Sequence, residues 1–142
     1  MAHATRKNLG YLLAKASQRW NELLADGFGT EGFPEVRPSY GSVLIPLFEE
    51  DGLRMGEIAR RVRLTKQTIT TLVGLCERDG LVARQPDPED GRATIVSLTP
   101  QARRFESAAE RVLAELDREV ADQLGPRQRA TLRAALIALA EL

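Results

Sequence analysis

The sequence predicts a mainly α-helical fold of 142 residues with one small β-hairpin. Over most of the chain, apolar residues recur at steps of three and four, the spacing of amphipathic helices. Two short stretches between residues 81 and 98 instead read as strands around a tip rich in proline and glycine, which is typical of a hairpin. The length corresponds to one domain at ~150 residues per domain. No internal repeat or long linker interrupts residues 1–142, so we expect a single domain.

Composition narrows the classes of function. Apolar residues make up 43% and charged residues 28%, as in an ordinary soluble globular protein. No stretch approaches the ~18 consecutive apolar residues of a membrane span, and residues 1–7 do not resemble a secretory signal. The single cysteine and the single histidine, His3, weigh against disulfides, metal clusters and histidine-based catalysis. We therefore expect a cytoplasmic protein that is not an enzyme, uses no metal or cofactor and does not enter a membrane.

The first predicted helix covers residues 8–25, where leucines, Ala16 and Trp20 follow the helical spacing. The pair Asp26-Gly27 should end it, because glycine weakens a helix and favours a turn. Residues 27–38 contain further glycines and prolines and are expected to form a loop.

Two more helices are expected before the basic centre of the chain. Ser39 is a candidate N-cap for a helix that runs to about Glu50, and Pro46 should kink that helix. A short helix follows over residues 55–62, where the apolar side chains form one stripe.

A longer helix is predicted from its N-cap Thr65 to about Asp79, where Gly80 ends it. Its apolar stripe follows the i, i+3, i+4, i+7 pattern and consists of Ile69, Leu72, Val73 and Cys76. The two hairpin strands are then expected at residues 81–85 and 93–98. Thr99-Pro100 has the form of a helix start, and the chain ends in two helices separated by Gly125-Pro126.

Charge is unevenly distributed along this neutral chain. Residues 54–84 carry seven basic and three acidic side chains, whereas residues 1–53 and 105–142 are each slightly acidic. A neutral average can therefore hide a local surface that binds phosphate, although a solvated surface is the plainer interpretation.

Two helices with a short break, followed by a hairpin, form the outline of a winged helix-turn-helix. On the predicted helix after Thr65, the face opposite the apolar stripe is polar and carries short side chains. Gln67 there can pair with adenine, and a methyl group of Thr70 or Thr71 can touch a thymine methyl group, while Gly74 leaves room for close approach. The alternative is that this face is only the solvated side of an amphipathic helix.

The central segment resembles the MarR family of transcription regulators. The resemblance covers about residues 39–104 and rests on motifs that occur in order at suitable spacing. These motifs are Met55 to Val62, Leu64 to Val73, Leu75 to Arg84, Asp87 to Ala93 and Val96 to Thr99. The resemblance implies a homodimeric transcription regulator that binds double-stranded DNA at specific sequences and acts as a repressor on a near-palindromic operator.

Carried over to this sequence, the resemblance implies roles for single residues. The helix that begins at Thr65 would enter the major groove, Arg92 would reach the minor groove from the wing tip, and Asp90 would hold Arg92 by a charge-assisted hydrogen bond. At least one acid of the tip should also be engaged by a cation, with Arg92 and Arg84 the nearest candidates. The expected DNA-binding residues are Thr65, Lys66, Gln67, Thr70, Thr71, Arg84, Asp90 and Arg92. The candidates for phosphate contacts are Arg60, Arg61, Arg63, Lys66 and Arg84, with Lys66 and Arg84 first.

The terminal helices, residues 8–25 and 102–142, carry more apolar surface than a small winged helix needs. They are expected to pair two copies of the chain, as the resemblance implies. A small-molecule effector is a further expected partner, with Tyr11, Trp20, Tyr40 and Phe48 as candidate pocket residues, although aromatic residues at this spacing are more often core. Cys76 lies on an apolar stripe, which favours a buried thiol over a redox sensor.

The main alternative is a winged helix that serves as a protein-interaction module and does not bind DNA. An enzyme is disfavoured because the sequence offers no nucleophile–base pair, glycine-rich phosphate loop or metal cluster.

Overall fold

The computed structural model describes residues 4–142, so His3 and the two residues before it lie outside the described part. The expected order of helices and hairpin is confirmed, with a two-residue strand and a short 3-10 helix added. The elements are α1 (Leu9–Thr30), η1 (Pro38–Tyr40), α2 (Gly41–Glu49), β1 (Leu53–Arg54), α3 (Met55–Val62), α4 (Lys66–Arg78), β2 (Val82–Pro86), β3 (Thr94–Leu98), α5 (Pro100–Leu124) and α6 (Pro126–Ala140).

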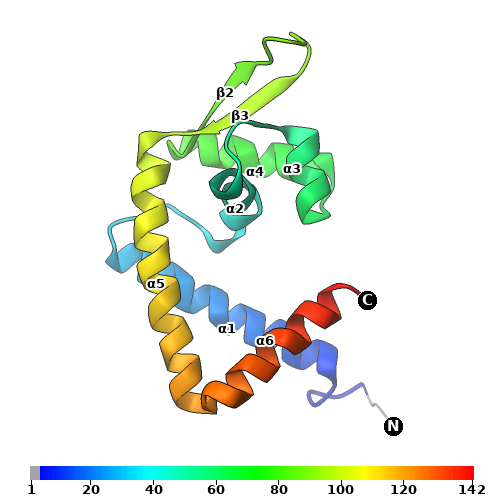
Figure 1. The fold of residues 1–142 in the computed structure, drawn as a ribbon, viewed down its shortest axis with the longest axis vertical. Helices are drawn as coiled ribbons and strands as arrows, with labels where there is room; N and C mark the ends of the chain where they lie inside the picture. The colour runs from blue at the N-terminus through cyan, green and yellow to red at the C-terminus, as the bar shows by residue number, and fades with distance from the viewer. Residues whose placement is uncertain (1–3) are drawn as a thin grey trace.

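The chain forms a winged head joined to a helical base (Figure 1). The head consists of α2, α3, α4 and an antiparallel sheet in the order β1-β3-β2, in which Leu53 pairs with Val96 and Arg84 pairs with the same residue from the other side. The hairpin β2–β3 is the wing, and it projects from the end of the molecule opposite α1 and α6. The long helix α5 connects the two ends. This is the winged helix-turn-helix with flanking helices that the sequence predicted.

Helix α1 continues to Thr30, through the pair Asp26-Gly27 that was expected to end it. Phe28 is buried, and its ring lies edge-on to that of Phe105 on α5, with 4.8 Å between ring centroids. A Cβ atom on Gly27 would lie 2.5 Å from a methyl carbon of Val112, so this glycine lets α1 approach α5 closely. The predicted end at Asp26-Gly27 is therefore wrong, because packing against α5 outweighs the weak helix propensity of glycine.

The start of the second helix also differs from the prediction. Ser39 lies inside the 3-10 turn η1, and α2 begins at Gly41 without a side-chain cap. Pro46 lies within α2 and does not end it. Val43, Leu44 and Leu47 on the same helix are at most 1% exposed, so core packing holds the segment in place despite the missing proline amide.

The helix-turn-helix follows the prediction closely. Helix α3 ends at Val62, and the left-handed backbone of its C-cap Arg63 (φ 57°) makes the tight break. The Thr65 hydroxyl accepts a hydrogen bond from the Thr68 amide at 3.1 Å and so caps α4, as expected. Ile69, Val73 and Cys76 are fully buried, which confirms the predicted apolar stripe at three of its four positions, and Leu72 is half-buried.

Helices α1 and α6, which form the base, bury little, since Phe28 is the only buried residue of α1. Thr99 caps α5 through the Ala102 amide, and Gly125 separates α5 from α6, both as predicted. None of the residues of α6 is buried. In the part of the chain from residue 4 onward, no helix is both long and apolar enough to cross a membrane.

Candidate nucleic-acid interface

The outer face of α4 is exposed and polar. Lys66, Gln67, Thr70 and Thr71 all lie on this face and are exposed, while the opposite face packs into the core. The hydroxyls of Thr70 and Thr71 donate to the carbonyl oxygens four residues earlier, at 2.8 and 3.1 Å. With these protons engaged, each threonine presents a methyl group and an acceptor oxygen. Such a face can approach base edges without bulky or charged side chains in the way.

The start of α4 carries an unfavourable charge for a helix. Its first turn has no acidic residue, and the basic Lys66 occupies the first position, where the helix dipole favours a negative charge. Among residues 4–142, the Lys66 ammonium has no ion-pair partner. Backbone amides at a helix start together with a free ammonium are suited to bind an anion such as a phosphate.

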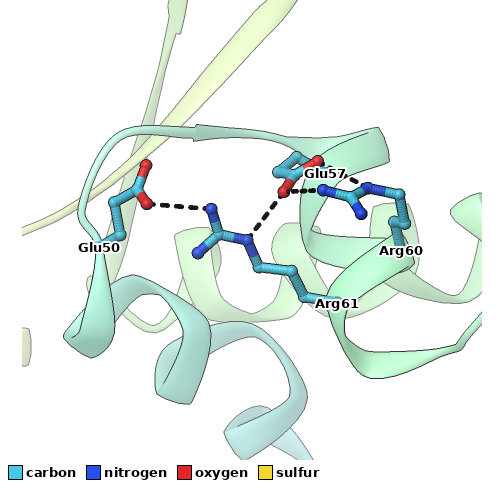
Figure 2. Close-up of polar contacts among 4 residues, drawn as sticks. All are labelled: Glu50, Glu57, Arg60 and Arg61. Atoms are coloured by element: carbon cyan, nitrogen blue, oxygen red, sulfur yellow. Dashed lines mark hydrogen bonds and ion pairs between the residues drawn. The ribbon is translucent and has the colours of Figure 1, made fainter.

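Two of the expected phosphate contacts, Arg60 and Arg61, are engaged within the head (Figure 2). Arg60 bonds the Glu57 carboxylate at 3.0 and 2.5 Å, and Arg61 bridges Glu57 at 2.9 Å and Glu50 at 3.0 Å. The hydrogen bonds from Arg60 and Arg61 hold the pKa of Glu57 below its usual value. This cluster connects the segment after α2 to α3. Arg61 has two acidic partners and is less available to a phosphate, whereas the Arg60 side chain is 75% exposed and a phosphate can compete for it.

Arg63 and Arg84 also have acidic neighbours. Arg63 reaches Glu141 at the C-terminal end of α6, at 3.2 Å, and Arg84 lies 3.2 Å from Glu77 on α4. The Arg84 guanidinium also lies 3.7 Å from where a Cβ of Gly74 would be, so it runs along the outer face of α4. Because these pairs are exposed, they are weak and a phosphate can compete for either arginine.

Asp90 shapes the wing tip through the backbone. Its carboxylate accepts a hydrogen bond from the Arg92 amide at 3.1 Å, and its carbonyl accepts from the Ala93 amide at 2.9 Å. The expected bond from Asp90 to the Arg92 guanidinium is not formed. The Arg92 side chain is exposed and makes no ion pair with any residue that the structure describes. A free cation therefore stands at the end of the wing.

The acid that a cation engages at the wing is Asp87, and the cation is Arg54. The Asp87 carboxylate accepts from Nε of Arg54 at 2.7 Å and also from Nη2. The expectation of an engaged acid is confirmed, but Arg92 and Arg84 were the wrong partners. Sequence reasoning missed Arg54 because β1 is only two residues long and leaves no alternating pattern.

A cavity of about 280 Å³ lies between α1, α2 and α5. Its walls are mostly apolar, and three phenylalanines contribute to them. Charged side chains also line it. The lining residues are Leu24, Phe28, Val36, Arg37, Pro38, Gly41, Leu44, Ile45, Phe48, Phe105, Glu106, Ala109, Glu110 and Leu113.

Of the four aromatic residues expected at a pocket, only Phe48 lines this cavity. Tyr40 is a core residue, and its hydroxyl donates to Asp79 at 2.6 Å. Burial, together with the bond to Asp79, raises the pKa of Tyr40. Trp20 packs half-buried against the core, and Tyr11 is exposed with the Lys15 ammonium 5.6 Å from its ring. Helical spacing therefore identified core and surface aromatics as well as a pocket residue.

Cys76 is completely buried in the head. Burial raises the pKa of its thiol to about 12, so the thiolate that reacts with oxidants is scarce at neutral pH. This agrees with the interpretation of Cys76 as a small core residue.

The chain is similar to known regulators in both sequence and structure. The model of the MarR family matches residues 46–93. A probable transcriptional regulator from Pseudomonas aeruginosa is 31% identical with a TM-score of 0.80, over 94% of this chain and 97% of that one. PcaV from Streptomyces coelicolor, solved with its natural ligand, is 25% identical with a TM-score of 0.80, over 99% and 98%. The repressor CouR, solved on a 23-mer DNA duplex, shares the fold at 24% identity, with a TM-score of 0.82 over 98% and 99%.

Curated transcription regulators match at 30–40% identity, and the chain spans 30–60% of their length. The segment that the family model matches contains α3, α4 and β2, which are the helix-turn-helix and the first strand of the wing described above. The P. aeruginosa relative extends the similarity over nearly the whole chain. The chain belongs to the MarR family.

Proposed function

We propose that this protein is a homodimeric transcription regulator that binds double-stranded DNA, and that it acts as a repressor on a near-palindromic operator. The observation that carries the proposal is the pair of free cations, Lys66 at the start of α4 and Arg92 at the wing tip, beside an exposed polar helix face. Helix α4 lies in the major groove, and the wing reaches the neighbouring minor groove. This is a binding role and involves no catalysis.

The contacts on α4 divide into two kinds. Gln67 and the methyl groups of Thr70 and Thr71 read bases, whereas Lys66 and Arg84 bind phosphates. Thr65 acts by capping the helix, since its hydroxyl is engaged by Thr68. Asp90 acts by shaping the wing turn that carries Arg92.

Gln67→Ala tests the base-reading role. We expect the variant to lose ~1–3 kcal/mol of discrimination at one base pair in each half-site, because a glutamine can hold adenine with two hydrogen bonds. Affinities for the operator and for duplexes that differ at single positions measure this loss. Lys66→Ala is the matched comparison, and it should weaken binding to all sequences alike. A uniform loss in Gln67→Ala would instead assign this residue to the backbone.

The homodimer is supported by apolar surface that one chain leaves uncovered. Leu9 and Leu12 on α1 are 75% and 49% exposed, and Leu136 and Ile137 on α6 are 44% and 57% exposed. Each of these two helices thus leaves large apolar side chains in water, as surfaces that pair with another protein do. A two-fold dimer covers the same patch on both copies and presents two heads to successive turns of DNA.

A small, largely apolar effector is the second expected partner, and the cavity between α1, α2 and α5 is a suitable site for it. The cavity borders both the base and the head, so a ligand there can favour one arrangement of the heads over another. Ala109→Trp would fill the cavity, since Ala109 lines it. We expect compounds that raise the melting temperature and release DNA to lose both effects in this variant. Retention of both effects would exclude the cavity.

A protein-interaction module remains the competing function. It predicts that DNA binding is weak, that it does not depend on salt, and that Arg92 is dispensable.

A further inference from the structure

Asp87 is unusual among the residues from 4 to 142, because it is the only buried polar or charged side chain, at 8% exposed. One carboxylate oxygen accepts from Nε and Nη2 of Arg54, and the other accepts from the Glu89 amide at 2.9 Å. The hydrogen bond from Glu89 and the neighbouring Arg54 hold the pKa of Asp87 below its usual value, against the opposing effect of burial. The side chain is therefore held as a carboxylate by fixed partners.

Arg54 connects this carboxylate to the helix-turn-helix. Its backbone pairs with Ile95 on β3, and it directly precedes Met55, the first residue of α3. Its side chain crosses to Asp87, the first residue after β2. A single ion pair thus joins the residue before α3 to the residue at which the wing tip begins.

The wing tip beyond this pair has few other restraints. The Asp87 amide donates to the Ala93 carbonyl at 3.0 Å and closes the hairpin. Between these two residues, the Glu89 and Arg92 amides are held by the side chains of Asp87 and Asp90. The direction in which the tip carries Arg92 therefore depends on Asp90 within the turn and on Asp87 at the start of the tip and, through Asp87, on Arg54.

The charge of Asp87 would oppose DNA binding if it acted alone. A carboxylate beside phosphates repels them, and the tip holds two further acids, Glu89 and Asp90. We therefore expect the Asp87 carboxylate to have a structural role, through its ion pair with Arg54, that outweighs its repulsion of phosphates.

We propose that Arg54 is a positioning residue for DNA binding, which orients the wing tip through Asp87 so that Arg92 and α4 engage one duplex together. The inference rests on the proposed DNA-binding function. Arg54 itself need not touch DNA, and its effect passes through Arg92.

The direction in which Asp87→Asn changes DNA affinity distinguishes a positioning role from a purely electrostatic effect. Asp87→Asn removes a negative charge with little change in shape, so electrostatics alone would tighten binding. Positioning predicts that Asp87→Asn and Arg54→Gln each weaken operator binding about 5- to 10-fold. In an Arg92→Ala background, either change should cost less than about 2-fold, because coupled residues are not additive. Arg54→Lys keeps the charge but replaces the two guanidinium donors that converge on one Asp87 oxygen, and its affinity should fall between those of wild type and Arg54→Gln.

Tighter binding by Asp87→Asn would overturn the proposal. So would additive losses for Arg54→Gln and Arg92→Ala, which would mean that Arg54 contacts phosphate directly. Amide hydrogen exchange in the free protein supplies a readout that needs no DNA. Amides of residues 89–92 should exchange faster in Asp87→Asn and Arg54→Gln while the α4 amides are unchanged, and unchanged exchange at the tip would contradict the proposal. If the wild-type protein bound no duplex, the DNA-binding function would fail, and the exchange data would still decide whether the ion pair orders the tip.

Discussion

Replacing Leu132 and Leu136 together with glutamate should convert the dimer to monomers and lower the apparent affinity for operator DNA by about 10²- to 10⁴-fold. Both leucines lie on α6 one helical turn apart and are 41% and 44% exposed in the single chain. Charges at these positions would be buried without partners in a dimer, which disfavours association. The second head then binds as a separate molecule, and the gain from linking two half-sites is lost.

Sedimentation velocity measures the oligomeric state of this double variant, and fluorescence anisotropy with labelled operator measures its affinity. Arg127→Glu is the matched control, because it makes the same total change in charge at an exposed position on the face of α6 opposite Leu136. It should remain dimeric and bind DNA nearly as well as wild type. A double variant that stays dimeric, or a monomer that keeps full affinity, would contradict the role assigned to α6.

Arg92→Ala should weaken operator binding by about 10- to 100-fold, which corresponds to the ~1.5–3 kcal/mol of a hydrogen bond to a charged group. The guanidinium is exposed at the wing tip and has no ion-pair partner in the described part of the chain. Its removal therefore should leave the stability of the fold nearly unchanged. If the contact is to phosphate, the slope of affinity against salt should fall by about 0.9, whereas a contact to bases in a narrow minor groove changes sequence preference.

Titrations of operator at several salt concentrations measure both quantities for this variant. Arg118→Ala is the control, since Arg118 is exposed in the C-terminal half of α5. Figure 1 shows that this helix starts beside the wing and that its C-terminal half runs away from it. It removes the same charge and should leave affinity within about twofold of wild type. Equal affinities for Arg92→Ala and wild type at physiological salt would exclude the wing from DNA binding.

Local signals in the sequence were sufficient for α3, α4 and the wing. The caps at Thr65 and Thr99 and the stripe of Ile69, Val73 and Cys76 depend on neighbours a few residues away, and all are confirmed. Helix α1 was predicted too short because the role of Gly27 depends on Val112, which lies far along the chain. The residues near a glycine in the sequence do not show whether it forms a turn or allows close packing of two helices.

In the candidate site too, features set by local periodicity were predicted and features set by tertiary contacts were not. The helical periodicity placed Gln67, Thr70 and Thr71 on the exposed face of α4, where the structure has them. The ion pair of Arg54 joins it to Asp87, which is 33 residues away, so its role was missed. Arg61 was a candidate for a phosphate contact, although Glu50 and Glu57 engage it. Tyr40 was expected at a pocket because its spacing does not distinguish a wall residue from a core residue.

Selection of bound fragments from a random duplex library, followed by a salt titration of the selected duplex, tests the central claim most directly. The account predicts a near-palindromic sequence with half-sites about one helical turn apart, and an affinity that falls steeply as salt rises. If the folded, dimeric protein enriched no sequence, the regulator function would be contradicted and the protein-interaction module would take its place.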